Sequence, residues 1–301
     1  MTAVTDPCAS FGDGFVKAHD GVGLYYRQWS PPVEVTSFVL FIHGIGLHGS
    51  SPPYGEKILI RQLLDRGTAF YSIDLRGHGM SGGSIDGISR DTLIKDIDSH
   101  VEHIHEQYSS ARIFLYGHNF GGILALYYAS RCPKNLRGII MSEYSTRIRD
   151  EVKKIREPTA AIALKERLVE KLYKRSKKLE ILSPDDYEQL CDKYRIPMDA
   201  GIMRSLETSG SGRKCMLYGK DFFTACGVGQ DAAIAGAVRL PFLTIFSRND
   251  PFFDIRGAYD ILTRVQSYDK ELTQVDAAGH YGIIEASKDI VGKWVLSRTT
   301  K

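Results

Sequence analysis

Residues 115–122, LYGHNFGG, hold the pattern with the clearest chemical meaning in this 301-residue chain. Glycines flank Asn119 at the spacing G-x-N-x-G, after a β-type apolar run and before a helical one. A sharp turn between a strand and a helix strains its central residue, and only glycine fits closely beside it. The helix that follows directs the N–H groups of its first turn at this residue. The pattern therefore predicts that residue 119 occupies a nucleophile elbow.

Five segments, each after a strand-like run, occur in an order that resembles the monoacylglycerol lipases and related serine esterases of the α/β-hydrolase superfamily. They are residues 41–46 (FIHGIG), 74–81 (DLRGHGMS), 115–122 (LYGHNFGG), 247–251 (SRNDP) and 278–282 (AGHYG). Each alone is a weak signal, but together they follow the α/β-hydrolase order of elbow, acid and histidine. The resemblance covers nearly the whole chain outside residues 147–238.

The resemblance implies a catalytic role for several residues. Asp250 takes the place of the triad acid, with Asp254 as the fallback, and His280 takes the place of the histidine. The backbone N–H groups of Ile45 and Phe120 correspond to the oxyanion hole. Two donors aimed at a developing alkoxide are usually the largest single catalytic contribution.

Other residues near these segments are expected to line or support the pocket. His48 continues the loop after Ile45, as in the family, and is expected to contact substrate. Glu143 follows a strand and is a further polar residue expected at the mouth of the site. His43 and His78 are interpreted as turn and packing residues and the turn at 74–81 as structural, and His118 is expected to point away from the reaction centre.

Asn119 stands where the resemblance places the catalytic serine. A serine hydroxyl can give its proton to a histidine and attack a carbonyl, whereas the nitrogen lone pair of an amide is delocalised. Loss of the nucleophile costs about a million-fold in kcat in a serine protease. We therefore expect an ester or related carbonyl substrate with an apolar part, and poor or absent triad hydrolysis.

Four other interpretations of Asn119 stay open. His280 with Asp250 could act as a general base in a non-hydrolytic reaction of lyase or isomerase type. The chain could be a catalytically dead member that binds a ligand. It could be an inactivated variant, although alanine is the usual replacement. Finally, Asn119 could be a blocked aspartate nucleophile of the epoxide hydrolase or dehalogenase type, which the segments at 41–46 and 74–81 resemble less.

The elements that would position these residues alternate between short apolar runs and amphipathic stretches. Strands are predicted at residues 24–29, 37–42, 69–73, 113–116, 138–141, 242–246 and 272–275, several of them apolar throughout, as in a parallel sheet covered on both faces. Helices are predicted at 90–108 and 120–132. On the first of these, His100, His103 and His105 are interpreted as surface residues, not as metal ligands. The alternation predicts a doubly wound α/β sheet.

Residues 147–238 differ from the rest, because strand-like runs fade and Lys, Arg and Glu dominate. We predict that they form a helical cap inserted into the sheet domain. The resulting organisation is a core of residues 1–146 and 239–301 with the cap at 147–238. The ligand would bind between the sheet and this cap.

Composition excludes several classes of protein. The net charge is +3, too small for the basic surface of a nucleic-acid-binding protein. The five cysteines are odd in number and have no metal-ligand spacing, which favours reduced thiols. No signal-like N-terminus and no apolar run of about 18 residues is present. We predict a cytoplasmic protein with a small-molecule substrate and no cofactor; its oligomeric state is not readable from the sequence.

Overall fold

A single mixed β-sheet organises the chain. The computed structural model describes residues 10–44, 47–49, 55–84, 88–131, 133, 136–147, 181–182, 215–216, 231–248, 250, 253–276 and 282–299. The eight strands of the sheet lie in the order β1-β2-β4-β3-β5-β6-β9-β10. Their bounds are β1 Ser10–Lys17, β2 Gly23–Ser30, β3 Ser37–Ile42, β4 Thr68–Ile73, β5 Arg112–His118, β6 Leu136–Ser142, β9 Phe242–Ser247 and β10 Lys270–Val275.

Strand direction places three of the predicted site residues, Asn119, Glu143 and Asp250, at one edge of this sheet. β1, β2 and β4 pair antiparallel, whereas β4, β3, β5, β6, β9 and β10 all pair parallel. The carboxyl ends of these parallel strands therefore meet at the same edge, where α/β folds bind their ligands. A separate antiparallel pair joins β7 Ile181–Leu182 and β8 Cys215–Met216.

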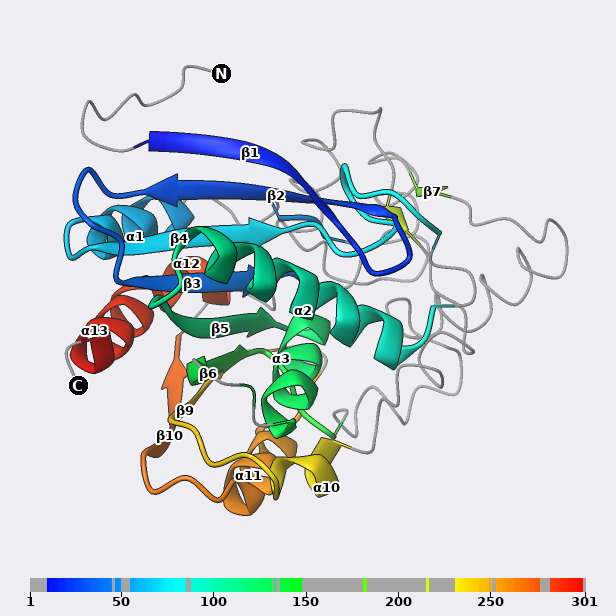
Figure 1. Cartoon of the computed structure of the whole chain (residues 1–301). Coiled ribbons are helices and arrows are strands. Elements are labelled where there is room, and N and C mark those ends of the chain that lie inside the picture. Colours follow the sequence, from blue (N-terminus) through cyan, green and yellow to red (C-terminus); the bar gives the residue numbers. More distant parts are fainter. Residues whose placement is uncertain are drawn as a thin grey trace, which may run out of the picture.

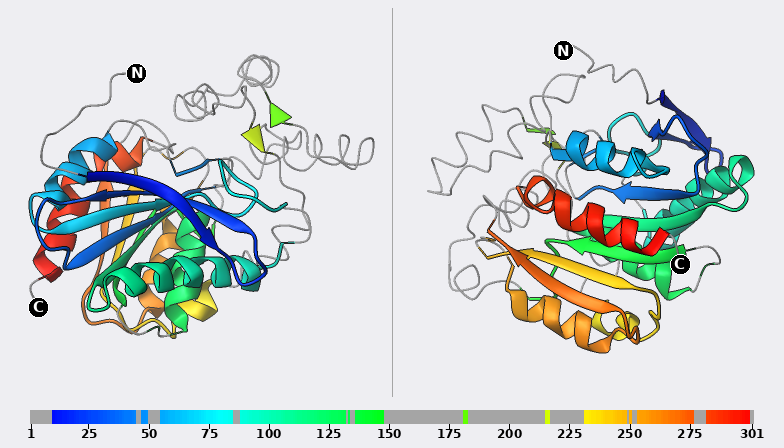
Figure 2. Two further views of the ribbon diagram at one scale, coloured as in Figure 1. Left: turned by 45° about the horizontal axis from the view of Figure 1, so that its top comes forward. Right: turned by 90° about the vertical axis from the view of Figure 1, so that its left-hand side faces the viewer.

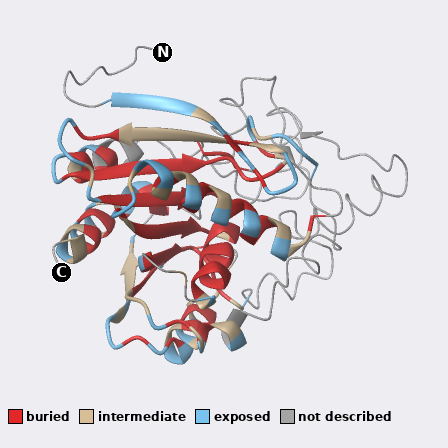
Figure 3. Cartoon of the chain, viewed as in Figure 1, coloured by how far each residue is buried: buried red, intermediate tan, exposed pale blue. Residues whose placement is uncertain are grey.

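Helices cover both faces of the sheet (Figures 1 and 2). On one face α2 Arg90–Gln107, α3 Phe120–Ser130 and α11 Ile255–Arg264 share an apolar core with alternate side chains of β3, β4 and β5. On the other face α1 Gly55–Leu64, α12 Ile283–Ala286 and α13 Lys288–Thr299 pack on the remaining strand side chains. Residues at the centre of the sheet are consequently buried on both sides, as all six of β3 are (Figure 3).

The predicted fold class is confirmed, and each predicted strand is present with bounds that differ by a few residues. β1, α1, α11, α12 and α13 were not predicted. β1 carries glycine at residues 12 and 14 and leaves most of its residues exposed, so it has little apolar patterning to detect. It is held by its antiparallel ladder with β2 along its whole length.

The interpretation of the α2 histidines as surface residues is wrong for His100. Its side chain is buried, and its Nδ1 lies 3.1 Å from the hydroxyl of Tyr71. Leu93, Ile97 and Ile104 share the same helical face, so His100 belongs to the apolar stripe by its spacing. The helix begins at an N-cap serine, Ser89, whose Oγ accepts from the N–H of Thr92 at 3.1 Å.

The last part of the predicted cap that the structure describes packs on the core. α10 Asp231–Ala235 contacts α3 and α11, and Ala235 and Val238 are buried in the same apolar cluster as α3. Residues 148–180, 183–214 and 217–230 lie outside the described residues, so the boundaries of the cap stay predictions.

Candidate active site

The elbow between β5 and α3 holds Asn119 in a strained backbone conformation. Its φ of 51° and ψ of −114° lie in a region that residues with a side chain rarely adopt. The N–H of Asn119 donates to the carbonyl oxygen of Ser142 at 2.8 Å, and its own carbonyl accepts from Gly122 at 2.9 Å. The sequence pattern thus predicted the turn correctly, and these bonds hold it in place.

Glycine is required on both sides of the elbow because the backbones approach too closely for a side chain. A Cβ atom on Gly117 would lie 2.2 Å from the carbonyl oxygen of Gly121. One on Gly121 would lie 2.0 Å from the carbonyl oxygen of Ile42, at the end of β3. The G-x-N-x-G spacing therefore brings α3 against the neighbouring strand as well as allowing the turn.

The side chain of Asn119 occupies one of the two predicted oxyanion donors. Its Oδ1 accepts a hydrogen bond from the backbone N–H of Phe120 at 2.7 Å. The second predicted donor, Ile45, and the predicted base, His280, lie outside the described residues.

Gly49, between β3 and α1, is held by a buried carboxylate. Asp74, directly after β4, accepts from the N–H of Gly49 at 2.6 Å, from the N–H of Met80 at 2.8 Å and from the guanidinium of Arg27 at 2.8 Å. The Oγ of Ser72 donates to the carbonyl of Gly49 at 2.7 Å. We call Arg27, Gly49, Ser72, Asp74 and Met80 the Asp74 cluster. The cluster fixes the backbone of Gly49, directly after His48.

The charge of Asp74 is stabilised inside the protein. Burial raises the pKa of this carboxyl group, but the hydrogen bond and charge of Arg27, together with the hydrogen bond from the N–H of Met80, hold the pKa below its ordinary value. A buried carboxylate of this kind is stable only when it is paired and hydrogen-bonded. The expectation that the turn at 74–81 is structural agrees with these contacts. Arg27 was missed, although a charged residue within an apolar strand is a signal that could have revealed it.

The histidines next to the site, His43, His78 and His118, are packing residues, as predicted for the first two. All three are buried. His43 accepts from the N–H of Leu75 through Nε2 at 3.0 Å, and His118 lies 3.1 Å from Ser142 Oγ through Nδ1. Burial lowers the pKa of His43 to about 3 and that of His78 to about 4, so both are neutral near pH 7.

His48 is buried beside the Asp74 cluster. Burial lowers its pKa below the ordinary value of a histidine, although the nearby carboxylate of Asp74 acts in the opposite direction. A neutral imidazole at this place can contact an uncharged ligand. Its predicted role in binding substrate stays a prediction.

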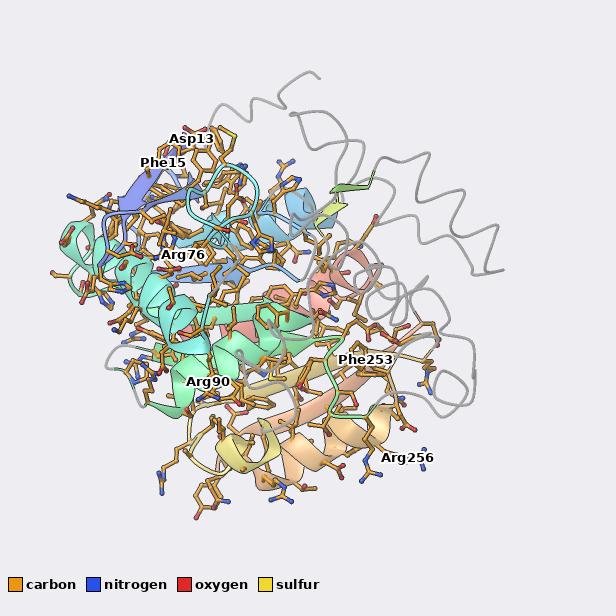
Figure 4. The ribbon with its side chains drawn as sticks, turned by 90° about the vertical axis from the view of Figure 1, so that its right-hand side faces the viewer. Asp13, Phe15, Arg76, Arg90, Phe253 and Arg256 are labelled. Atoms are coloured by element: carbon orange, nitrogen blue, oxygen red, sulfur yellow. The ribbon has the colours of Figure 1, made fainter. Side chains whose placement is uncertain are left out.

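Two buried carboxylates, Glu143 and Asp250, follow β6 and β9 at the same edge as Asn119. Glu143 has a φ of 49°, and its Oε1 accepts from the N–H of Ser247 at 2.9 Å. Asp250 Oδ1 accepts from the N–H of Phe253 at 2.8 Å. Phe253, labelled in Figure 4, contacts the ring of Tyr144 at 6.2 Å between centroids. Glu143 thus joins the ends of two strands that carry site residues.

Asp254, the fallback acid, has a different position. It caps α11 by accepting from the N–H of Arg256 at 2.8 Å, and it forms an ion pair with the guanidinium of the same residue. Asp250 is therefore the better candidate for the acid.

Within the described ranges, no group of three or more His, Cys, Asp or Glu residues could hold a metal ion. No helix in the same ranges has the length and apolar character needed to cross a membrane.

Comparisons with known proteins agree with this architecture. Residues 34–195, more than half of the chain, match the family Hydrolase_4, described as serine aminopeptidase S33. Human monoglyceride lipase is 25% identical over 287 residues, covering 93% of this chain and 89% of the lipase. Monoacylglycerol lipase of Mycolicibacterium smegmatis is 23% identical over 290 residues, covering 92% and 94%. A soluble variant of Saccharomyces cerevisiae monoglyceride lipase, solved with a substrate analogue, superposes with a TM-score of 0.71 at 18% identity, covering 100% and 98%.

Proposed function

Because this chain belongs to the family Hydrolase_4, serine aminopeptidase S33, and is an esterase- or lipase-like hydrolase, we propose that it binds a carboxylic ester with an apolar part. The ester is of the monoacylglycerol type, in line with the names of its relatives. We further propose that Asn119 leaves hydrolysis of this ester slow. The observation that carries the proposal is the side-chain amide of Asn119 in the elbow, whose Oδ1 accepts a hydrogen bond from the N–H of Phe120.

The proposed reaction needs a nucleophile, a base and an oxyanion hole. In the proposal His280 is the base, Asp250 orients it, and the N–H groups of Ile45 and Phe120 bind the oxyanion. Asn119 impairs this arrangement twice. Its amide nitrogen cannot attack the ester carbon, and its Oδ1 competes with the substrate oxygen for the N–H of Phe120. A slow attack by water, assisted by His280, is the route that is left.

The first test compares the chain with Asn119→Ser and Asn119→Ala on a panel of monoacylglycerols and short activated esters. Serine supplies the hydroxyl, and because loss of a nucleophile costs about a million-fold in kcat, we expect a gain of several orders of magnitude. Alanine frees the N–H of Phe120 without supplying a nucleophile, so it should gain at most the about 10²–10³-fold that one oxyanion donor contributes, far below the gain of the serine variant. Silence of the serine variant on every ester would contradict the proposed substrate class. Bound monoacylglycerol without turnover would then favour a dead ligand-binding member.

A second test assigns the acid. In the Asn119→Ser background, Asp250→Asn should lower kcat by about 10⁴-fold, because the histidine loses its orientation and the correct tautomer. Asp254→Asn is the matched control, since it removes a carboxylate four residues away that caps α11. Equal losses of kcat in the two variants, or a loss confined to Asp254→Asn, would contradict the assignment of Asp250 as the acid.

A further inference from the structure

We infer that Asn119 is a self-modifying residue, whose side-chain amide cyclises onto the backbone nitrogen of Phe120 and is then hydrolysed. The products are aspartate and isoaspartate at position 119, with a cyclic imide as the intermediate. The inference does not depend on the proposed ester substrate, because the reaction needs only this chain and water.

The backbone of the elbow already has the shape of the ring. In an L-residue, Cβ is offset from the backbone nitrogen by one third of a turn about the Cα–C bond. With ψ at −114°, Cβ of Asn119 therefore nearly eclipses the nitrogen of Phe120. A five-membered ring through N, C, Cα, Cβ and Cγ requires this eclipsed arrangement. The backbone conformation that positions a nucleophile in other elbows therefore places Cβ of Asn119 next to the nitrogen of Phe120.

The side-chain amide of Asn119 also contacts the nitrogen that would attack it. Oδ1 of Asn119 lies 2.7 Å from the nitrogen of Phe120, and Cγ is one bond from Oδ1. Phe120 begins α3, and its N–H donates to this side chain and not to a carbonyl of the helix. Asn119 is only half-buried, so water can reach the amide.

The surrounding contacts prevent the turn from relaxing out of this shape. The N–H of Asn119 is bonded to Ser142, and its carbonyl to Gly122. Gly117 and Gly121 also pack closely against neighbouring backbone on both sides of the elbow. The unfolded chain has no such restriction, and an asparagine there adopts the required ψ only occasionally.

The reaction balances without any further reagent. The nitrogen of Phe120 loses its proton to hydroxide or water and forms a bond to Cγ. The bond from Cγ to Nδ2 breaks, and Nδ2 takes up a proton and leaves as ammonia. Water then adds to one imide carbonyl. Opening of the new N–Cγ bond gives aspartate, and opening of the original peptide bond gives isoaspartate. Aspartate at residue 119 places a carboxylate, itself a possible covalent nucleophile, in the elbow.

The experiment follows the mass of the purified chain during incubation at 37 °C and pH 8, folded and in urea. Peptide mapping then locates each change. The chain has three asparagines, so Asn135 and Asn249 are internal references. We expect a gain of about one dalton at residue 119, preceded by a transient species lighter by one ammonia. We expect it to form about tenfold faster in the folded protein than in urea, the rate equivalent of fixing the backbone of one residue.

Asn119→Gln is the matched variant, because its longer side chain would have to form a six-membered ring and should gain no mass at this position. Folding usually protects asparagine, so a rate at residue 119 that is equal or slower in the folded protein overturns the inference. So does a gain in mass at residue 119 with no ammonia-loss species at any time, since direct hydrolysis of the amide needs no ring. Neither readout involves an ester, so failure here leaves the proposed function untouched.

Discussion

The Arg27→Met substitution tests whether the Asp74 cluster depends on a charge pair inside the protein. Methionine keeps an apolar stem in the sheet and removes the guanidinium, which also lies 4.6 Å from the centroid of the Tyr25 ring. Asp74, whose side chain is fully buried, would keep the N–H groups of Gly49 and Met80 but lose its cation. The variant therefore leaves a buried carboxylate without charge compensation.

The expected loss of stability follows from this geometry. Breaking a buried ion pair by removing one partner costs about 3–5 kcal/mol. The side chain of Arg27 is 13% exposed, and two N–H donors remain on Asp74, so the lower end, about 3 kcal/mol, applies. In a domain of this size about 1 kcal/mol lowers Tm by about 2–4 °C. The variant should therefore unfold roughly 6–12 °C below the unchanged chain.

Thermal unfolding at pH 7, followed by circular dichroism, measures this shift. Arg131→Met is the matched control, because Arg131 pairs with Asp91 on the surface, where the two side chains are 49% and 66% exposed. A pair of that kind contributes less than about 1 kcal/mol. If Arg27→Met lowers Tm no further than Arg131→Met, the buried pair does not hold the cluster together and the reasoning fails.

Two further predictions concern acid and close packing. Burial lowers the pKa of His43 and His100 to about 3 and of His78 to about 4, against 6.5 ordinarily. The unfolded chain therefore binds three protons that the folded protein does not. Stability should be full above pH 6.5 and fall by about 4 kcal/mol per pH unit below it, until the folded values are reached. Urea midpoints at pH 7.5 and 5.5 check this, and equal midpoints would contradict it. Gly121→Ala should lower the free energy of unfolding by more than about 4 kcal/mol, because the new Cβ would meet backbone. Gly236→Ala, whose Cβ would lie 3.5 Å from the nearest atom, should change Tm by less than about 2 °C. Similar yields and Tm values for the two variants would refute the packing argument.

The parallel strands and the elbow could be predicted because their own residue types and spacing indicate them. Runs such as residues 37–42 are apolar throughout, and the two glycines around Asn119 report a turn that no other residue fits. The sequence also placed Asp250 and Glu143 after strands. Since the carboxyl ends of parallel strands meet at one edge, their proximity to the elbow could be expected.

The Asp74 cluster could not be predicted because it joins residues far apart in the chain. Arg27 reaches Asp74 only because β2 pairs antiparallel with β4, and nothing local to either segment specifies that pairing. His100 was predicted to lie on the surface because histidine is polar, although its helical spacing places it on the apolar face of α2. The hydrogen bond between Asn119 and Phe120 could not be predicted, because the sequence says that the two residues are adjacent but does not specify the ψ of Asn119.

The order of the strands has a consequence for how the chain emerges from the ribosome. The strands from β1 to β6 form one continuous part of the sheet, whereas β9, which pairs with the other edge of β6, begins only at Phe242. At about 5–20 residues per second, the nascent sheet presents β6 as an open edge for about 5–20 s. That edge is apolar, with Ile139, Ile140 and Met141 at its centre, and an uncovered edge of this kind invites pairing with another chain. During this interval the nascent chain can aggregate through β6. Binding of a chaperone to this edge, or wide spacing of nascent chains, would favour folding.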